Sequence, residues 1–177
     1  MKKIICVLSI IVILFSFCAC GSKETSTENS NENSTTVSDA SKETKTKKTN
    51  KTMKALSHDQ FKSLMLEQGL EVYLENKSDR GGITLSKEAN AATYYNFTTP
   101  EDAKNYYISA QEQLDEETQS ESAPYFLKET EIGKNYEFRI YVNEYNNYEF
   151  IAYVDSTFID VAAGKTEGPQ LVKALGF

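Results

Sequence analysis

Carboxylates are the most abundant side chains in this sequence that could act in catalysis, and Asp155 and Asp160 are the candidate pair of catalytic acids. They flank one expected strand, so they are able to approach each other as the two acids of a glycan-cleaving enzyme must. Residues 55–177 carry twenty-one acids, however, and chance proximity explains such a pair better than function does. We therefore expect no enzymatic activity. A small cell-envelope hydrolase or glycan-acting enzyme that uses these two carboxylates is kept as the alternative.

Residues that bind metals or act as nucleophiles are scarce. His58 is the only histidine, and the three cysteines, Cys6, Cys18 and Cys20, all lie near the N-terminus. Neither a zinc cluster of His and Cys nor a histidine-dependent triad can be assembled from this set. The acidic stretch 115–121 lacks the central glycine and the oxygen spacing of a calcium loop. We predict neither a metal site nor a bound cofactor.

Partners that carry phosphate are disfavoured by motif and by charge. Gly164-Lys165-Thr166 has the ending of a phosphate-binding loop, but that loop needs a glycine five residues earlier, where Ile159 stands. Residues 55–177 contain ten basic and twenty-one acidic side chains, a formal net charge of −11. Because an acidic surface repels phosphate, we expect neither a nucleotide nor a nucleic acid as partner.

Tyrosine is the most unusual component, since all eleven tyrosines lie after residue 55. Alternation along the expected strands places Tyr141 and Tyr153 on the sheet face opposite the core, and Tyr73 of an earlier strand joins them. Exposed tyrosines on a sheet offer a large, rigid contact area with a polar tip, which suits protein or glycan recognition. Tyr73, Tyr141 and Tyr153 are therefore a candidate recognition face. The alternative is that a helix covers this face and the tyrosines pack beneath it.

The N-terminus has the pattern of an export signal. Lys2 and Lys3 give it a positive start, and residues 4–17 form an apolar run. A run of about fourteen residues matches the apolar region of a signal peptide, which is about 7–15 residues long. A membrane-spanning helix needs about twenty apolar residues, so this run is short for a permanent span.

Ala19-Cys20-Gly21, at the end of this run, resembles the lipobox of bacterial lipoproteins, although Phe17 and Cys18 depart from its usual residues. The resemblance implies that residues 1–19 are removed and that Cys20 carries a diacylglyceryl lipid with palmitate-type chains. Two acyl chains anchor a protein stably, whereas one holds it only marginally. The implied location is the outer face of the cytoplasmic membrane, as in the small lipoproteins of Gram-positive Firmicutes. An ordinary cleaved signal or an uncleaved anchor is the alternative.

Residues 20–54 are predicted to be the lipidated cysteine followed by a disordered tether. They are rich in Ser, Thr, Asn, Glu and Lys, and Val37 and Met53 are the only sizeable apolar residues among them. Such a composition cannot offset the entropy lost on ordering. Residues 55–177 suffice for a single globular domain, which contains no cysteine and must be stabilised by packing alone.

Local signals in 55–177 predict alternating helices and strands. Ser57 and Gln60 form a capping box before a helix that ends at Gly69, and Thr99-Pro100 begins a second helix. Alternating apolar residues predict a half-buried strand over 70–75 and a three-stranded meander over 136–162. A strand over 91–97 and a closing helix near the C-terminus complete the main elements, with a short strand over 125–128 in addition.

The predicted order, α-β-β-α-β-β-β-α, has no repeated βαβ crossover. It indicates an α+β fold, with an antiparallel sheet and helices packed on one face. Together with the anchor, this favours a membrane-anchored extracytoplasmic module that binds rather than catalyses. A protein or a cell-wall polymer is the expected partner, besides the membrane reached through the lipid on Cys20.

Overall fold

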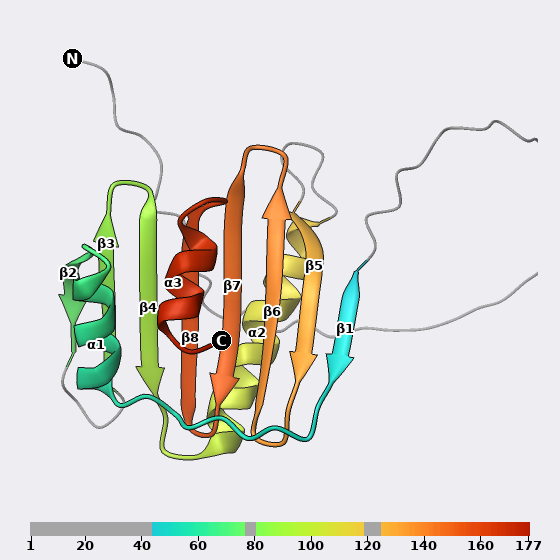
Figure 1. Ribbon diagram of the computed structural model, residues 1–177. Coiled ribbons are helices and arrows are strands. Elements are labelled where there is room, and N and C mark those ends of the chain that lie inside the picture. The colour runs from blue at the N-terminus through green and yellow to red at the C-terminus, as the bar shows by residue number, and fades with distance from the viewer. Residues whose placement is uncertain (1–43, 77–80, 119–124) are drawn as a thin grey trace, which may run out of the picture. The chain divides into compact units, whose positions relative to one another are not determined.

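The structure is a computed structural model, and it describes residues 44–76, 81–118 and 125–177, which belong to one compact unit spanning 40–177. The predicted signal peptide and Cys20 lie outside the described residues. The described residues form eight strands and three helices, and Figure 1 shows how they are arranged. The elements are β1 (Lys45–Lys48), α1 (His58–Glu67), β2 (Glu71–Glu75), β3 (Gly82–Lys87), β4 (Asn90–Asn96), α2 (Pro100–Glu117), β5 (Tyr125–Ile132), β6 (Tyr136–Asn143), β7 (Asn147–Val154), β8 (Thr157–Gly164) and α3 (Gly168–Ala174).

All eight strands form one sheet in the order β1-β5-β6-β7-β8-β4-β3-β2. β1 lies parallel to β5, and the other neighbouring pairs are antiparallel. The predicted α+β class is confirmed. The predicted element order and the wholly antiparallel sheet are wrong, because that order leaves out β1, β3 and β5.

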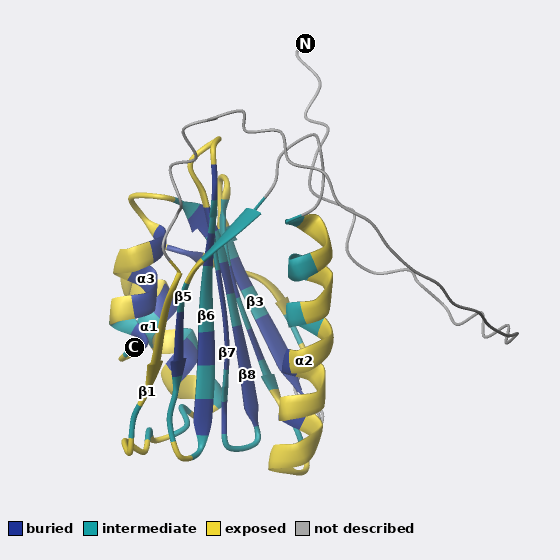
Figure 2. Ribbon diagram, turned by 90° about the vertical axis from the view of Figure 1, so that its right-hand side faces the viewer, coloured by how far each residue is buried: buried dark blue, intermediate teal, exposed yellow. Residues whose placement is uncertain are grey.

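Helices cover both faces of the sheet, so the predicted one-face arrangement is also wrong (Figure 2). On one face, α1 packs against β3 and β4 and α3 against β7 and β8, whereas α2 lies against β5, β7 and β8 on the other. The physical reason is that the meander carries large side chains on both faces. A larger apolar cluster, with Phe61 and Phe150, lies under α1 and α3, and a smaller one, with Tyr107 and Phe158, lies under α2. No described helix is both long enough and apolar enough to span a bilayer.

The predicted starts of the first two helices are confirmed. The Gln60 amide N–H donates to the Ser57 hydroxyl, and the Ser57 N–H donates to the Gln60 side chain, which completes the capping box. Gly69 has a φ of +83°, the left-handed conformation that ends a helix without strain only at glycine. Thr99 caps α2, with Pro100 as its first residue. These boundaries follow from local sequence because they depend on backbone groups only a few residues apart.

Strand β2 shows where an alternating pattern misleads. Leu70, just before it, is buried, but Val72 and Leu74 are 42% and 61% exposed. β2 is an edge strand whose register with β3 shifts between Val72 and Leu74. The shift breaks the two-residue period, and no described element covers the strand's outer side. Strand β3 was not predicted, because its first residue belongs to Asp79-Arg80-Gly81-Gly82, which reads as a turn.

The folded unit begins before the predicted boundary at residue 55, so the predicted tether 20–54 is too long at its C-terminal end. β1 pairs with β5, and the Thr49 N–H donates to the Ile132 carbonyl at 2.9 Å. Residues 49–56 then run along the ends of the strands to α1 (Figure 1), and Met53 packs against the larger apolar cluster. The lysines of β1 give it the composition of a linker. Lysine is, however, also common on edge strands, where it deters unwanted pairing, so composition alone does not distinguish the two.

We expect limited proteolysis to leave a stable fragment that begins near residue 44, because β1 and residues 49–56 are hydrogen-bonded to the rest of the unit. Brief digestion with a protease of broad specificity, followed by intact-mass measurement, locates the first protected residue. A dominant early fragment beginning at residue 55 would contradict the pairing of β1 with β5.

Candidate functional site

The two faces of the sheet differ in chemistry. The face under α1 and α3 packs as the larger apolar cluster. On the face under α2, a cross-strand row runs Arg139, Ile151, Asp160 and Thr93 along β6, β7, β8 and β4. Charged side chains between a helix and a sheet are expensive to bury, and those with shifted pKa values concentrate at functional sites. The candidate site is therefore built from the α2 face.

Glu149 of β7 and Asp160 of β8 form an acid pair on this face. Asp160 lies opposite Ile151, and Glu149 lies two residues before Ile151, so the two acids are diagonal neighbours that side chains can bridge. Burial, the charge of Asp160 and a hydrogen bond with Asp160 raise the pKa of Glu149 well above its usual value. Burial raises the pKa of Asp160 to about 6. Its Oδ1 atom is buried and accepts no hydrogen bond within the described part of the chain.

Two tyrosines flank the acid pair from different elements. Burial, followed by the charges of Glu149 and Glu117, raises the pKa of Tyr125 to about 12. Burial, followed by interactions with Tyr95 and Asp160, raises the pKa of Tyr106 to about 12. Both hydroxyl groups therefore stay protonated at physiological pH and can act as hydrogen-bond donors.

A separate polar network fixes α2 to the sheet. The Tyr141 hydroxyl donates to Asp115 Oδ1 at 2.8 Å, and the Tyr107 hydroxyl donates to Glu137 Oε1 at 3.0 Å. The Arg139 guanidinium lies between the two acids, 3.5 Å from Asp115 Oδ2 and 3.6 Å from Glu137 Oε1. The Tyr141–Asp115, Tyr107–Glu137 and Arg139–Asp115 contacts each join α2 to β6, so the network sets which side of α2 faces β4.

The half of this face formed by β2, β3 and β4 has no helix over it among the described residues. We call it the open half-sheet. Leu74, Thr84 and Thr93 share one row across it, and the two threonine hydroxyls lie 3.2 Å apart. The same row continues to Asp160, so the open half-sheet leads directly to the acid pair.

Four aromatic rings mark the boundary between α2 and the open half-sheet. The Tyr106 ring centroid is 4.9 Å from that of Phe158, 5.4 Å from that of Phe97 and 5.5 Å from that of Tyr95. Despite these three contacts, Tyr106 remains 43% exposed. A large aromatic side chain is thus held in a fixed position while it faces solvent.

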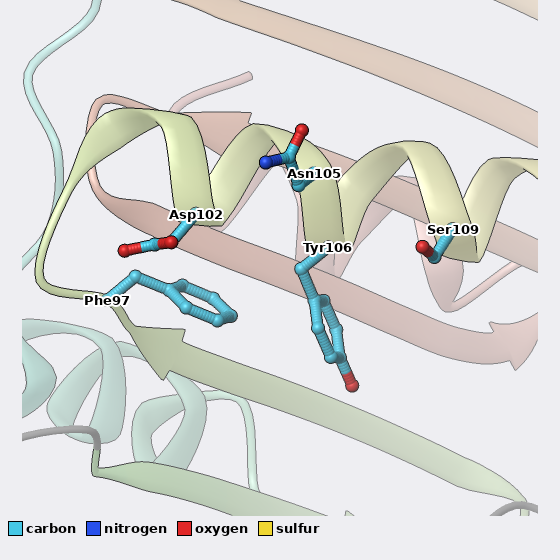
Figure 3. A pocket seen from close by; sticks show the side chains of 5 residues that line it. All are labelled: Phe97, Asp102, Asn105, Tyr106 and Ser109. Carbon is cyan, nitrogen blue, oxygen red and sulfur yellow. The ribbon is translucent and has the colours of Figure 1, made fainter. Parts of the chain in front are cut away.

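A pocket of about 350 Å³ lies beside these rings, and we call it the α2 pocket. Figure 3 shows its five lining side chains, with the rings of Phe97 and Tyr106 on the side of α2 that faces β4. The polar lining groups come from the first three turns of α2. An apolar wall with a few polar groups is the usual composition of a ligand site. The lining residues are Phe97, Asp102, Asn105, Tyr106 and Ser109.

The tyrosines predicted as one recognition face do not share an exposed surface. Tyr141 is 0% exposed beneath α2, and Tyr153 is half-buried against the Tyr107 ring, with the centroids 5.1 Å apart. Only Tyr73, 73% exposed on edge strand β2, faces solvent. Tyr141 and Tyr153 do lie on the face opposite the larger apolar cluster, but α2 covers it there, as the alternative reading of the sequence expected.

Asp155 and Asp160 do not form the acid pair proposed from the sequence. Asp155 lies in the turn between β7 and β8, with a φ of +50°, and accepts a hydrogen bond from Asn135 Nδ2 at 2.9 Å. Asp160 lies in the middle of β8, beside Glu149. Alternation along β7 and β8 indicates that Glu149 and Asp160 share a face, but only the register of the two strands shows that they are neighbours.

The pocket residues were not singled out by sequence reasoning. Helical spacing predicts Tyr106 only as part of an apolar stripe, and β-propensity predicts Phe97 only as the last residue of the strand over 91–97. A signal was available, because Tyr95, Phe97 and Tyr106 lie close together in sequence around the start of α2. Helical and strand periodicity, however, do not distinguish an aromatic residue in the core from one at its margin.

Other candidates add no second site. His58 Nδ1 lies 3.1 Å from Asp59 Oδ1, and the His58 ring packs edge-on against Tyr94. Among the residues that the structure describes, no group of three or more His, Cys, Asp or Glu side chains is arranged to hold a metal ion. Comparison with known proteins finds no matching family model, curated protein or solved structure.

Proposed function

We propose that this protein is a lipid-anchored, non-catalytic binding module on the outer face of the cytoplasmic membrane, and that the α2 pocket contacts its ligand. The lipobox-like Ala19-Cys20-Gly21 supports the anchor. The expected partner is a protein or a cell-wall polymer. The tyrosine-based face is replaced in this proposal by the α2 pocket, because α2 covers Tyr141.

The observation that carries the proposal is the fixed, exposed Tyr106 ring. Binding orders side chains, and each flexible side chain that is immobilised costs about 0.5–1.5 kcal/mol. Tyr106 has three ring neighbours and is already held in place, so this cost is small. Its exposed surface offers apolar area, and Asp102, Asn105 and Ser109 offer groups that orient a ligand.

The anchor is tested by Cys20→Ser. We expect this variant to leave the membrane fraction and to lose detergent partitioning, because a serine hydroxyl cannot carry the thioether-linked lipid. Cys18→Ser is the matched control and is expected to remain membrane-bound. If both variants partition like the wild-type protein, Cys20 is not the anchor.

The pocket is tested by placing a photo-crosslinking amino acid at position 105 in the native membrane. We expect a discrete adduct whose yield falls when Tyr106→Leu is added, because Asn105 and Tyr106 line the same pocket. The control is the same probe at position 104, because Lys104 is exposed and does not line the pocket. Adducts of the same mass and yield at both positions would count against the α2 pocket as the contact surface.

A cell-envelope hydrolase is the second candidate, favoured by the acid pair. A carboxyl with a pKa raised to about 6 is suited to act as a general acid, and Glu149 is its neighbour. The test is release of reducing ends from a cell-wall glycan preparation by the purified full-length protein. Turnover that is lost in Asp160→Asn supports this candidate, and no turnover by the wild-type protein rejects it.

A further inference from the structure

Helix α2 is acidic at both ends, while residues 103–111 between them contain no acid. It contains Lys104 as its one basic residue against six acids: Glu101, Asp102, Glu112, Asp115, Glu116 and Glu117. Asp160, beyond the helix, adds a carboxyl close enough to Tyr106 to act on its hydroxyl. Any ligand that reaches the α2 pocket therefore enters a negative potential, which attracts cations and repels anions.

Asp102 differs from the acids that the fold itself uses. Glu131 is paired with Lys47 at 2.9 Å, and Glu75 with Lys62 at 2.7 Å. The Asp102 carboxylate accepts only the Thr99 hydroxyl, at 2.8 Å, and no lysine or arginine of the described segments lies within ion-pair distance of it. An acid that lines a pocket without an internal cation is free to pair with an external one.

The aromatic wall favours the same kind of ligand. A cation placed over a tyrosine or phenylalanine ring is attracted by the negative face of the ring. The ring centroids of Tyr106 and Phe97 lie 5.4 Å apart, and both rings line the pocket together with Asp102. One ammonium or guanidinium group in the pocket can therefore contact an aromatic ring and the Asp102 carboxylate at the same time.

We infer that the α2 pocket binds a cationic side chain, the ammonium of lysine or the guanidinium of arginine, presented by a basic segment of a partner protein. This inference rests on the proposed binding function and specifies its ligand chemistry. An anionic wall polymer is disfavoured by the charge of α2. A neutral glycan would pack against the aromatic rings but would leave the carboxylate of Asp102 without a counter-charge.

The experiment titrates ¹⁵N-labelled full-length protein, in uncharged detergent, with a short Lys-Gly-Lys-Gly-Lys peptide. The matched ligand is the same peptide acetylated on every lysine. We expect amide shifts at Asp102, Asn105, Tyr106 and Ser109 with the charged peptide only. We expect Asp102→Asn or Tyr106→Leu to weaken binding about fivefold, as loss of about 1 kcal/mol implies. Added salt should weaken it further.

Two substitutions control for general effects. Glu101→Gln removes a neighbouring acid from the same helix turn, and Tyr145→Leu removes an exposed tyrosine from the β6–β7 turn. Tyr145→Leu is expected to bind like the wild-type protein, and Glu101→Gln to weaken binding much less than Asp102→Asn does. A Glu101→Gln loss equal to that of Asp102→Asn would overturn the inference, because it would indicate non-specific attraction to an acidic surface.

The remaining outcomes separate the inference from the proposed function. Equal binding of the acetylated peptide, or pocket shifts with a neutral glycan but none with the charged peptide, overturns the cationic ligand and leaves the pocket as a binding site. Absence of shifts with every probe also overturns the inference. In that case the crosslinking at position 105 decides the proposed function independently.

Discussion

Asp160→Asn is expected to make the protein more stable at pH 7, by about 1–2 kcal/mol in free energy of unfolding. The pKa of Asp160 in the folded protein is about 6, against an ordinary 3.8. Each pKa unit corresponds to about 1.4 kcal/mol, and relaxation of the surroundings around the buried charge reduces the full value. Asparagine keeps the shape of the side chain and removes the charge that the site disfavours.

The direction of the pH dependence follows from proton binding. Between the ordinary and the raised pKa, the folded state holds a proton that the unfolded state has already released, so stability falls as pH rises. For Asp160, the stabilisation is fully present below about pH 4 and is lost as the pH passes about 6. The raised pKa of Glu149 makes its ionisation lower stability in the same direction as that of Asp160.

Urea unfolding at pH 4.5, 6 and 7.5 measures this effect. We expect the wild-type protein to lose stability across the series and Asp160→Asn to lose less. Glu131 acts in the opposite direction, since bonds from Tyr136 and Lys47 lower its pKa, but it is the same in both proteins. Glu112→Gln removes an exposed acid and serves as the control for net charge. A variant less stable at pH 7.5 with an unchanged pH slope would refute the acid pair.

Asn135→Ala is expected to lower the free energy of unfolding by about 2 kcal/mol. The Asn135 side chain accepts from the Met53 N–H at 3.0 Å and donates to the Met53 carbonyl at 2.8 Å and to Asp155 at 2.9 Å. Each such bond contributes about 0.5–1.5 kcal/mol, and water reaches some of the groups that are released. Loss of the side chain therefore loosens residues 49–56 from the turn between β5 and β6.

Amide hydrogen exchange distinguishes this local loosening from general destabilisation. We expect the Met53 amide to exchange faster in Asn135→Ala by more than the change in global stability explains, while amides in β7 follow global stability. Lys134→Ala is the matched control, because its exposed side chain is removed while its backbone N–H still donates to the Lys51 carbonyl at 2.9 Å. Unchanged exchange at Met53 would show that Asn135 does not hold this segment.

Predictions from sequence succeeded where the controlling interactions are local. The capping box of Ser57 and Gln60, the left-handed Gly69 and the Thr99-Pro100 start depend on groups within one helical turn. The meander β6–β7–β8 was also predicted, since its alternation is regular and its strands are joined by short turns. For these elements, side-chain type and spacing carry the necessary information.

Predictions failed where the neighbour of a residue is remote in sequence. Lys45–Lys48 has the composition of a linker, and only its pairing with β5, more than eighty residues later, makes it a strand. Val72 and Leu74 have the alternation of a half-buried strand, but β2 lies at the edge of the sheet. Edge position and pairing are properties of the whole sheet, which no local pattern contains.

The candidate site follows the same division. By itself, the sequence determined the chemistry: a body rich in acids and tyrosines, with a lipobox-like Cys20 and no cysteine or histidine cluster. Tertiary structure decided the arrangement, because placing α2 over β5, β7 and β8 buries Tyr141, leaves β2, β3 and β4 open, and exposes Tyr106 beside Asp102. Strand register then made Glu149 the neighbour of Asp160. A side chain's exposure and pKa depend on what packs against it, and that is fixed by contacts between distant segments.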